Sequence, residues 1–173
     1  MEKYVPKMYQ KSVLDIDYDK LKEIGIKCLL FDLDNTLVPL NVKEPNDKLK
    51  EFIDGLKKDF KIIILSNNNN IKKLSITSTA LDIDFVKFAL KPFNKGFKMV
   101  EDKYNFDKKE MCIIGDQIMT DVLGGNKYGI YTVLIDPLKD EDLKVTLINR
   151  MIEKKIFKKL SKKKLFNKGD YYG

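Results

Sequence analysis

The stretch that most constrains the fold is a short apolar run, Cys28-Leu29-Leu30-Phe31, which is followed by two aspartates, Asp32 and Asp34. An unbroken apolar run that stops at polar residues is typical of a strand buried on both faces. Two carboxylates at the end of such a strand repel each other and lose hydration unless a cation lies between them. Mg²⁺ suits that position, because it binds one or two carboxylates and keeps water and phosphate in the rest of its shell. The alternative is a plain Asp-Asn-Thr turn, since these residues all favour turns.

Apolar runs and segments of helical periodicity alternate along the rest of the chain. We expect strands over residues 27–33, 61–66, 84–88, 111–115 and 131–135, and helices over 17–23, 46–58, 71–81, 94–104, 117–123 and 143–160. We expect Asp17, the Asn67–Asn70 run and Asn94 to cap helices, and Gly25 and the Gly124-Gly125 pair to end them. Strands that alternate with helices indicate βαβ units, so the pattern predicts an α/β fold with a parallel sheet.

Three of the expected strands stop at polar residues. The polar residues are Asp32 and Asp34 after the first strand, Ser66 at the end of the second, and Asp116 after the fourth, with Lys91 in a turn on the same side. Open α/β sheets bind ligands outside the carboxyl ends of their strands, at the topological switch point. A single polar strand end is compatible with a turn, but several on one edge favour a ligand site there.

The composition excludes several kinds of active site. The chain of 173 residues has no histidine, which excludes a Ser-His-Asp triad, a Cys-His pair and a histidine metal site. A cysteine-nucleophile phosphatase needs an arginine shortly after its cysteine, but the single arginine, Arg150, follows neither Cys28 nor Cys112 closely. We interpret both cysteines as buried thiols of a reducing compartment. Catalysis must therefore use carboxylates, lysine, hydroxyl groups and a metal ion.

We expect three parts: an arm over residues 1–26 that packs on the domain, a catalytic core over 27–140, and a basic helix and tail over 141–173. No apolar run approaches the ~18 residues of a membrane span, and the N-terminus lacks the apolar core of a signal peptide. We therefore expect a cytoplasmic protein that is at most peripheral on the inner face of the cell membrane.

The positive charge is concentrated in the tail. The formal net charge of the chain is +7, and residues 144–173 alone carry +8, from nine lysines and Arg150 against Glu153 and Asp170. An apolar stripe runs along the same segment: Ile148, Met151, Ile152, Ile156 and Leu160. A basic amphipathic helix can lie on an anionic membrane, or its stripe can pack on the domain while its lysines are solvated. We expect packing near Ile148 and Ile152, and an anionic partner, membrane rather than nucleic acid, for Lys158–Lys168.

Four motifs resemble those of the haloacid dehalogenase (HAD) phosphatases, in the order found in that family. They are Asp32-Leu33-Asp34-Asn35-Thr36, Ser66 after an apolar run, Lys91-Pro92, and Gly115-Asp116-Gln117-Ile118-Met119-Thr120-Asp121. Each motif alone is weakly specific, whereas the four together are strongly specific. A narrower similarity, carried by Lys11–Asp17, Gly115–Asn126 and Ile148–Arg150, is to the YqeG-type HAD subfamily of subclass IIIA, which is similar to phosphatidylglycerophosphate phosphatases.

The resemblance implies a Rossmann-like, three-layer HAD fold and a Mg²⁺-dependent phosphomonoester hydrolase that forms an aspartyl-phosphate. Asp32 would be the nucleophile and Asp34 the general acid and base, and their two-residue spacing would point both carboxylates at one phosphate. Mg²⁺ would bind Asp32, Asp116 and the backbone carbonyl of Asp34, while Ser66, Asn67 and Lys91 would bind the phosphoryl group. Thr36 would tie down the loop through its hydroxyl. Asp121 would hold metal waters or pair with Lys91, or it would be a plain helix-start aspartate.

The intervals between the motifs are short. Asp34 and Ser66 are separated by 31 residues, and Ser66 and Lys91 by 24, whereas a cap domain needs ~50 residues or more for its own core. An uncapped site suits a large substrate such as a lipid headgroup, and we expect dephosphorylation of phosphatidylglycerophosphate to phosphatidylglycerol. The alternatives are the same chemistry on a soluble sugar phosphate or nucleotide, and a HAD-like scaffold that binds RNA or the ribosome with little turnover.

Overall fold

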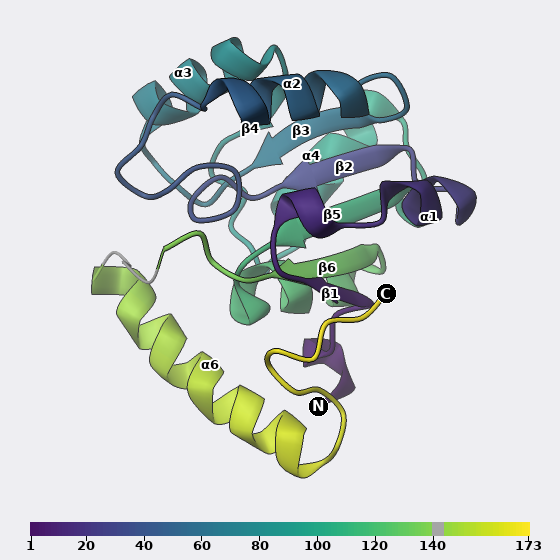
Figure 1. Cartoon of the computed structure of the whole chain (residues 1–173), viewed down its shortest axis with the longest axis vertical. Helices are drawn as coiled ribbons and strands as arrows, with labels where there is room; N and C mark the ends of the chain where they lie inside the picture. Colours follow the sequence, from purple (N-terminus) through teal and green to yellow (C-terminus); the bar gives the residue numbers. More distant parts are fainter. Residues whose placement is uncertain (140–143) are drawn as a thin grey trace.

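One parallel sheet organises the part of the chain that the computed structural model describes, residues 1–139 and 144–173 (Figure 1). Its six strands lie in the order β1-β6-β5-β2-β3-β4, and all five pairings are parallel. The strands are β1 (Met8–Gln10), β2 (Cys28–Phe31), β3 (Lys61–Leu65), β4 (Asp84–Val86), β5 (Met111–Gly115) and β6 (Tyr131–Ile135). The predicted α/β fold with a parallel sheet is confirmed.

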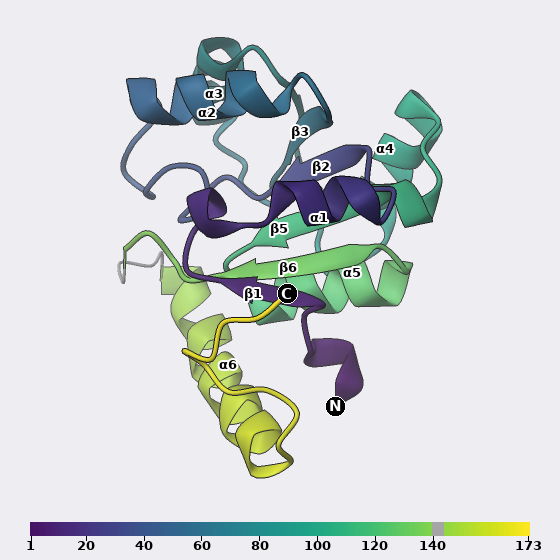
Figure 2. The ribbon, with the colours of Figure 1, turned by 45° about the vertical axis from the view of Figure 1, so that its right-hand side comes forward.

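Helices cover both faces of this sheet. They are α1 (Tyr18–Glu23), α2 (Asp47–Leu56), α3 (Ile71–Leu81), α4 (Lys95–Tyr104), α5 (Leu123–Tyr128) and α6 (Lys144–Lys162), with a π-helical turn at Ile118–Val122 before α5. Side chains alternate between the faces of a strand: in β2, Leu29 and Phe31 join a core with α1, α2 and α3, whereas Cys28 and Leu30 join a core with α4 and α5. Figure 2 shows α1 and α5 on opposite sides of the strands. The fold therefore has the three layers that we expected.

Side-chain caps begin three of the helices. Asp17, Asn46 and Asn70 each accept a hydrogen bond from the backbone N–H three residues later, at 2.9, 2.9 and 3.0 Å. Such bonds satisfy backbone donors that have no partner inside the helix. Asn94 lies at the expected N-cap position of α4, but its side chain makes no capping bond.

The connections between the strands leave no room for a cap domain. In the described chain, β2 and β3 are joined through α2 alone, and β3 and β4 through α3 alone. The expectation of an uncapped fold is confirmed, and the carboxyl edge of the sheet is bordered by loops, by the first turn of α3 and by the start of α6 (Figure 1).

The N-terminal arm contains a strand that the sequence did not reveal. Met8–Gln10 form β1, which pairs with β6 at one edge of the sheet. Three residues are too few to show an alternating pattern, and Met8 and Tyr9 are buried on opposite faces. Tyr9 also exchanges two backbone hydrogen bonds, of 2.8 and 2.9 Å, with Tyr172 near the C-terminus, so the last residues cover this edge strand.

The Gly124-Gly125 pair lies inside α5, so the prediction that it ends a helix is wrong. A Cβ atom on Gly125 would lie 2.5 Å from side-chain atoms of Ile113 and Thr132. The glycines therefore allow α5 to approach the sheet closely, and the helix ends instead at Gly129, whose φ is +90°.

The apolar stripe of α6 packs in the reverse of the expected manner. Ile156 and Leu160 are buried against Tyr9 and Phe166, whereas Met151 and Ile152 are exposed. Ile148 lies outside the residues whose side chains are described, and residue 143, where we expected the helix to begin, lies outside the described chain. Lys158–Lys168 are largely solvent-exposed, which agrees both with contact to an anionic partner and with simple solvation. None of the described helices is both long enough and apolar enough to cross a bilayer.

Candidate active site

The predicted site residues gather at the carboxyl edge of the sheet, around its switch point. The chain passes from β2 to β3 and β4 on one side, and β5, β6 and β1 lie on the other. Asp32 follows β2, Ser66 follows β3 and Asp116 follows β5, and the Asp32 N–H donates to the Ile114 carbonyl at 2.9 Å. This is the place where open α/β sheets bind ligands.

A buried lysine joins two of the aspartates. Lys91 Nζ lies 2.7 Å from Asp32 Oδ1 and 2.7 Å from Asp121 Oδ1. Burial raises the pKa of Asp32 to about 7, and the nearby ammonium of Lys91 opposes that increase. Burial tends to lower the pKa of Lys91, but the two carboxylates outweigh it and raise this pKa. Of the roles expected for Asp121, pairing with Lys91 is the one that the structure shows.

A second cation reaches the site from α6. The guanidinium of Arg150 donates to the Asp116 carboxylate through Nη2 and to the Asp116 carbonyl through Nη1, the latter at 3.2 Å. Nη1 also donates to the buried Glu153 at 3.0 Å, and Glu153 accepts the Met119 N–H at 3.2 Å. Burial raises the pKa of Asp116 to about 8, the charge of Asp32 adds to the increase, and Arg150 opposes it.

The aspartates fit a hard divalent cation. Asp32, Asp116 and Asp121 each offer a carboxylate oxygen, and these oxygens lie within 4.8 Å of one another. Within the described chain, the buried Asp116 Oδ1 has no hydrogen-bond partner, while Oδ2 is held by Arg150. A buried carboxylate oxygen without a partner is costly, and carboxylate oxygens are the ligands that Mg²⁺ prefers. The carboxylate of Asp34 does not belong to this cluster.

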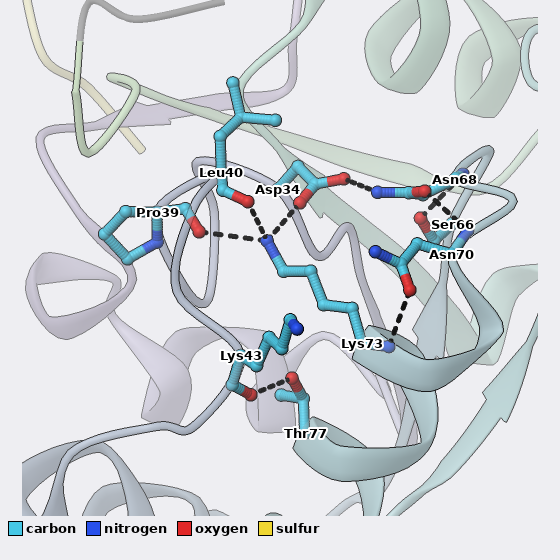
Figure 3. Close-up of polar contacts among 9 residues, drawn as sticks. All are labelled: Asp34, Pro39, Leu40, Lys43, Ser66, Asn68, Asn70, Lys73 and Thr77. Carbon is cyan, nitrogen blue, oxygen red and sulfur yellow. Dashed lines mark hydrogen bonds and ion pairs between the residues drawn. The ribbon is translucent and has the colours of Figure 1, made fainter. Parts of the chain in front are cut away.

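The Asp34 carboxylate instead binds a different lysine, Lys73, in the first turn of α3 (Figure 3). Lys73 Nζ lies 2.5 Å from Asp34 Oδ1 and also donates to the carbonyls of Pro39 and Leu40, at 2.9 and 2.8 Å. Asn68 Nδ2 donates to the other oxygen of Asp34 at 2.6 Å. Since β2 ends at Phe31, the strand rule that predicted a common direction for Asp32 and Asp34 does not extend to these residues.

The two residues after β3 differ in what their side chains contact. Ser66 is buried, and its Oγ accepts the Asn68 N–H at 3.0 Å. The Asn67 amide binds the main chain of Lys91 twice, donating to its carbonyl and accepting its N–H, both at 2.8 Å. Asn67 therefore positions Lys91, and the phosphate contact expected at Asn67 stays a prediction for its backbone N–H.

Thr36 does not tie down its loop in the predicted way. Its side chain is fully buried, but Oγ1 makes no hydrogen bond within the described residues. The loop is held by its main chain, where the Asn35 N–H donates to Val38 at 2.8 Å and the Leu37 N–H donates to Leu33 at 3.1 Å. Asn35 has a φ of +61°, a left-handed conformation that asparagine tolerates better than most residues.

The sequence matches a family model described as "Mitochondrial PGP phosphatase" over residues 2–139, which include all four motifs. The chain is also 35% identical over 161 residues to "Probable phosphatase YqeG" of Bacillus subtilis, covering 92% of this chain and 93% of that protein. The chain is a HAD phosphatase of the YqeG type, within the family that this model describes. It is further 27% identical over 143 residues to "Phosphatidylglycerophosphate phosphatase 1, chloroplastic" of Chlamydomonas reinhardtii, covering 78% of this chain but only 53% of the algal protein.

Solved structures agree with this HAD phosphatase in fold. A predicted HAD-like hydrolase of Porphyromonas gingivalis superposes with a TM-score of 0.53 at 14% identity, covering 74% of this chain and 98% of that one. A putative β-phosphoglucomutase of Bacteroides vulgatus superposes with a TM-score of 0.51 at 12% identity, covering 73% and 82%. At these identities the likeness concerns the architecture alone.

Sequence reasoning missed two residues of this phosphatase, Lys73 and Arg150. A lysine in the first helical turn is unusual, because the positive end of the helix dipole lies there. Lys73 takes that position in α3, and its ammonium reaches back to Asp34. Arg150 is the only arginine in the chain. Arginine presents its donors in a rigid planar fork that fits a carboxylate, which the lysine ammonium does not, so its single occurrence was a usable signal.

Proposed function

We propose that this phosphatase hydrolyses a phosphomonoester through an aspartyl-phosphate on Asp32, with Mg²⁺ as cofactor, and that its substrate is phosphatidylglycerophosphate. One observation carries the chemistry: the Asp32 carboxylate lies at the carboxyl end of β2, 2.7 Å from the buried Lys91 ammonium and within the aspartate cluster that contains Asp116. A carboxylate whose ionised form is favoured by a neighbouring ammonium, at an uncapped sheet edge, suits an oxygen nucleophile toward phosphorus.

Asp32, Asp116 and the backbone carbonyl of Asp34 would hold the metal. When bound, Mg²⁺ supplies positive charge that offsets the negative charge of the phosphoryl oxygens. Arg150 fixes one oxygen of Asp116 and leaves Oδ1 for the metal, which is how groups beyond the metal ligands commonly orient them.

The proposed reaction has two displacements at phosphorus. In the first, an Asp32 oxygen attacks phosphorus, the bond to the leaving oxygen breaks, and Asp34 donates a proton to that oxygen. In the second, Asp34 takes a proton from water, the water oxygen attacks phosphorus, and the bond to Asp32 breaks. Lys91 would stabilise the charge on the phosphoryl oxygens, and Ser66 would hydrogen-bond to them.

The contacts of Asp34 fix the orientation of its carboxylate. Lys73 and Asn68 bind its two oxygens at 2.5 and 2.6 Å, and the same ammonium binds two carbonyls of the following loop. A carboxylate held on both oxygens has little freedom to rotate. Positioning of this kind keeps an acid–base group within reach of the leaving oxygen.

Two observations support the lipid substrate. The family model and the algal relative both carry phosphatidylglycerophosphate phosphatase in their descriptions. The described chain also has no cap between the motif strands, so a headgroup that stays in a bilayer could reach the edge of the sheet.

The test is phosphate release from a panel of monophosphates: phosphatidylglycerophosphate in mixed micelles, glycerol 3-phosphate, a hexose phosphate, a nucleoside monophosphate and p-nitrophenyl phosphate. We expect Mg²⁺-dependent release that is greatest with the lipid. Asp32→Asn should reduce turnover by at least about a thousandfold, because the amide is a poor nucleophile. Asp47→Asn, at an exposed aspartate in α2, is the matched control.

The outcomes separate the parts of the proposal. Turnover by Asp32→Asn at the wild-type rate would exclude the aspartyl-phosphate, and full activity in excess EDTA would exclude the metal. A clear preference for a soluble phosphate would move the substrate assignment to that compound and leave the chemistry intact.

A further inference from the structure

The loop between β4 and α4 exposes large apolar side chains beside the active site. Phe88, Leu90 and Phe93 are 39%, 48% and 71% exposed, and they lie within six residues around the buried Lys91. Single exposed apolar residues are ordinary on a protein surface, whereas a group of them marks an interaction site.

The main chain of this loop is fixed, so the exposure is a property of its fold. Ala89 N–H donates to the Ser66 carbonyl at 3.1 Å, and Phe93 N–H donates to the Leu90 carbonyl at 2.8 Å. Phe88 and Leu90 have φ values of +52° and +53°, a left-handed conformation that is unfavourable for bulky residues. The loop therefore accepts unfavourable backbone angles and exposed apolar groups together, and neither contributes to the stability of the isolated chain.

The charge around these side chains is of one sign. Residues 85–100 contain four lysines and no acidic residue. Lys91 is buried in the site, while Lys87, Lys95 and Lys98 are exposed. Apolar side chains among lysines complement an anionic lipid surface, because the apolar side chains enter the interface and the lysines bind the headgroups.

A second surface of the same kind adjoins the site from α6. Met151 is 65% exposed and Ile152 is also exposed, directly after the arginine that binds Asp116. Asp116 and Asp32 belong to one cluster, so exposed apolar residues adjoin in the chain the two cations that contact it, Lys91 and Arg150. Figures 1 and 2 show α6 beginning at the carboxyl edge of the sheet and running away from it.

We propose that the 87–95 loop, together with Met151 and Ile152 of α6, binds an anionic bilayer and places the catalytic edge of the sheet on it. This proposal rests on the proposed function, and it names the surface through which a lipid headgroup would reach Asp32. It assigns membrane contact to the active-site edge, whereas the sequence pointed to Lys158–Lys168 near the far end of α6 (Figure 1). RNA would bind the lysines and stack its bases on Phe88 and Phe93, but it would give the aliphatic Leu90 no role.

The test is sedimentation with vesicles of equal parts phosphatidylglycerol and phosphatidylcholine, and with vesicles of phosphatidylcholine alone. We expect the wild-type protein to bind the anionic vesicles, and less so as salt rises, because the attraction is screened over ~10 Å at 0.1 M. Replacing Leu90 and Phe93 together by serine should weaken vesicle binding about tenfold or more, since two apolar side chains no longer enter the interface.

The matched control is Ile24→Ser. Ile24 is 48% exposed, as Leu90 is, but it lies at the end of α1 just before β2 begins, at the opposite edge of the sheet. This variant should bind vesicles like the wild type. All variants should hydrolyse p-nitrophenyl phosphate normally, because neither Leu90 nor Phe93 is part of the proposed chemistry.

Unchanged vesicle binding by the Leu90/Phe93 variant would overturn the proposal, as would a wild-type protein that binds RNA but not anionic vesicles. Either result would leave the phosphatase assignment standing if p-nitrophenyl phosphate is hydrolysed. Loss of that hydrolysis in the wild-type protein would refute the proposed function instead.

Discussion

The two motif-one aspartates are each held by a separate buried lysine. Lys91 binds Asp32, and Lys73 binds Asp34. A cation beside the nucleophile and another beside the acid–base group allow both carboxylates to remain in one site despite their like charge. Lys73 also joins Asp34 to the carbonyls of Pro39 and Leu40, so its removal should loosen the acid–base group rather than the nucleophile.

This difference gives a prediction for Lys73→Met. A general acid matters most when the leaving oxygen is strongly basic, as in an alkyl phosphate, and least for p-nitrophenolate. We expect kcat on an alkyl monophosphate to fall about a hundredfold, with a much smaller fall on p-nitrophenyl phosphate. Lys73→Arg should restore part of the loss, because it keeps a cation near Asp34.

The control for this experiment is Lys72→Met, at the exposed neighbouring lysine in α3, which should behave like the wild type on both substrates. Equal losses on the two substrates in Lys73→Met would show that Lys73 supports the fold of the site and not the proton transfer.

Among the site residues, the sequence predicted the side chains that follow the ends of strands and missed the side chains that reach the site from helices. Asp32, Ser66 and Asp116 follow from strand ends, since parallel strands bring their carboxyl ends to one edge. Lys73 and Arg150 contact residues 39 and 34 positions away in the chain, through loop and helix positions that no local pattern fixes. The Thr36 hydroxyl was expected to tie down its loop, but it is buried and has no hydrogen-bond partner in the described chain.

Helix α6 contributes to the site through a charge network. Arg150 lies between Asp116 and Glu153, whose side chains are both buried. Arg150→Met would leave two buried carboxylates without their cation, and we expect the free energy of unfolding to fall by up to about 3 kcal/mol. Urea denaturation at neutral pH measures this change.

Glu153→Gln in the Arg150→Met background should recover part of that loss, because it removes one of the unpaired charges. Lys154→Met, at an exposed position in the next turn, is the control. Identical midpoints for the wild type and Arg150→Met would mean that the network contributes nothing to stability.

Two helix glycines should respond in opposite ways to alanine. Gly125→Ala places a Cβ atom 2.5 Å from side chains of Ile113 and Thr132, so we expect destabilisation of about 1–3 kcal/mol. Gly55→Ala lies in α2 with nothing within 4 Å of the new atom, so we expect stabilisation of about 0.5–1 kcal/mol. Urea denaturation of both variants checks the signs, and a stable Gly125→Ala protein would contradict the close approach of α5.

These glycines also show why element boundaries were less predictable than element types. The sequence pattern placed the helices and five strands correctly in order, because their apolar periodicity reports burial directly. A Gly124-Gly125 pair is typical of a helix end, but here the glycines are needed because α5 lies so close to the sheet. Local propensity cannot reveal a tertiary contact of this kind. The short strand β1 was not predicted for the same reason, because its pairing with β6 joins residues more than 120 positions apart in the chain.

At the scale of the whole molecule, the two chain ends close the same edge of the sheet. Figures 1 and 2 show the last residues returning from α6 to β1. The Tyr9 ring packs at a tilt against Phe166, with ring centroids 5.1 Å apart, and the Tyr9 backbone pairs with that of Tyr172. An uncovered edge strand is a template for pairing between molecules, so this arrangement keeps β1 from associating with other chains.

The last prediction separates the structural and electrostatic roles of residues 161–173. Truncation after Leu160 removes the buried Phe166 and the Tyr172 partner of β1, so it should lower the free energy of unfolding by about 3 kcal/mol or more and promote self-association. Replacing Lys162, Lys163, Lys164 and Lys168 by serine keeps those contacts and should leave unfolding nearly unchanged. Urea denaturation and sedimentation velocity compare the two variants.

Because both variants lose the same four lysines, their binding to anionic vesicles can also be compared. Weaker binding by both would show that the tail contributes to membrane contact. Weaker binding by the truncated chain alone would follow from its altered fold. A truncated chain that is as stable and as monomeric as the wild type would show that β1 needs no cover.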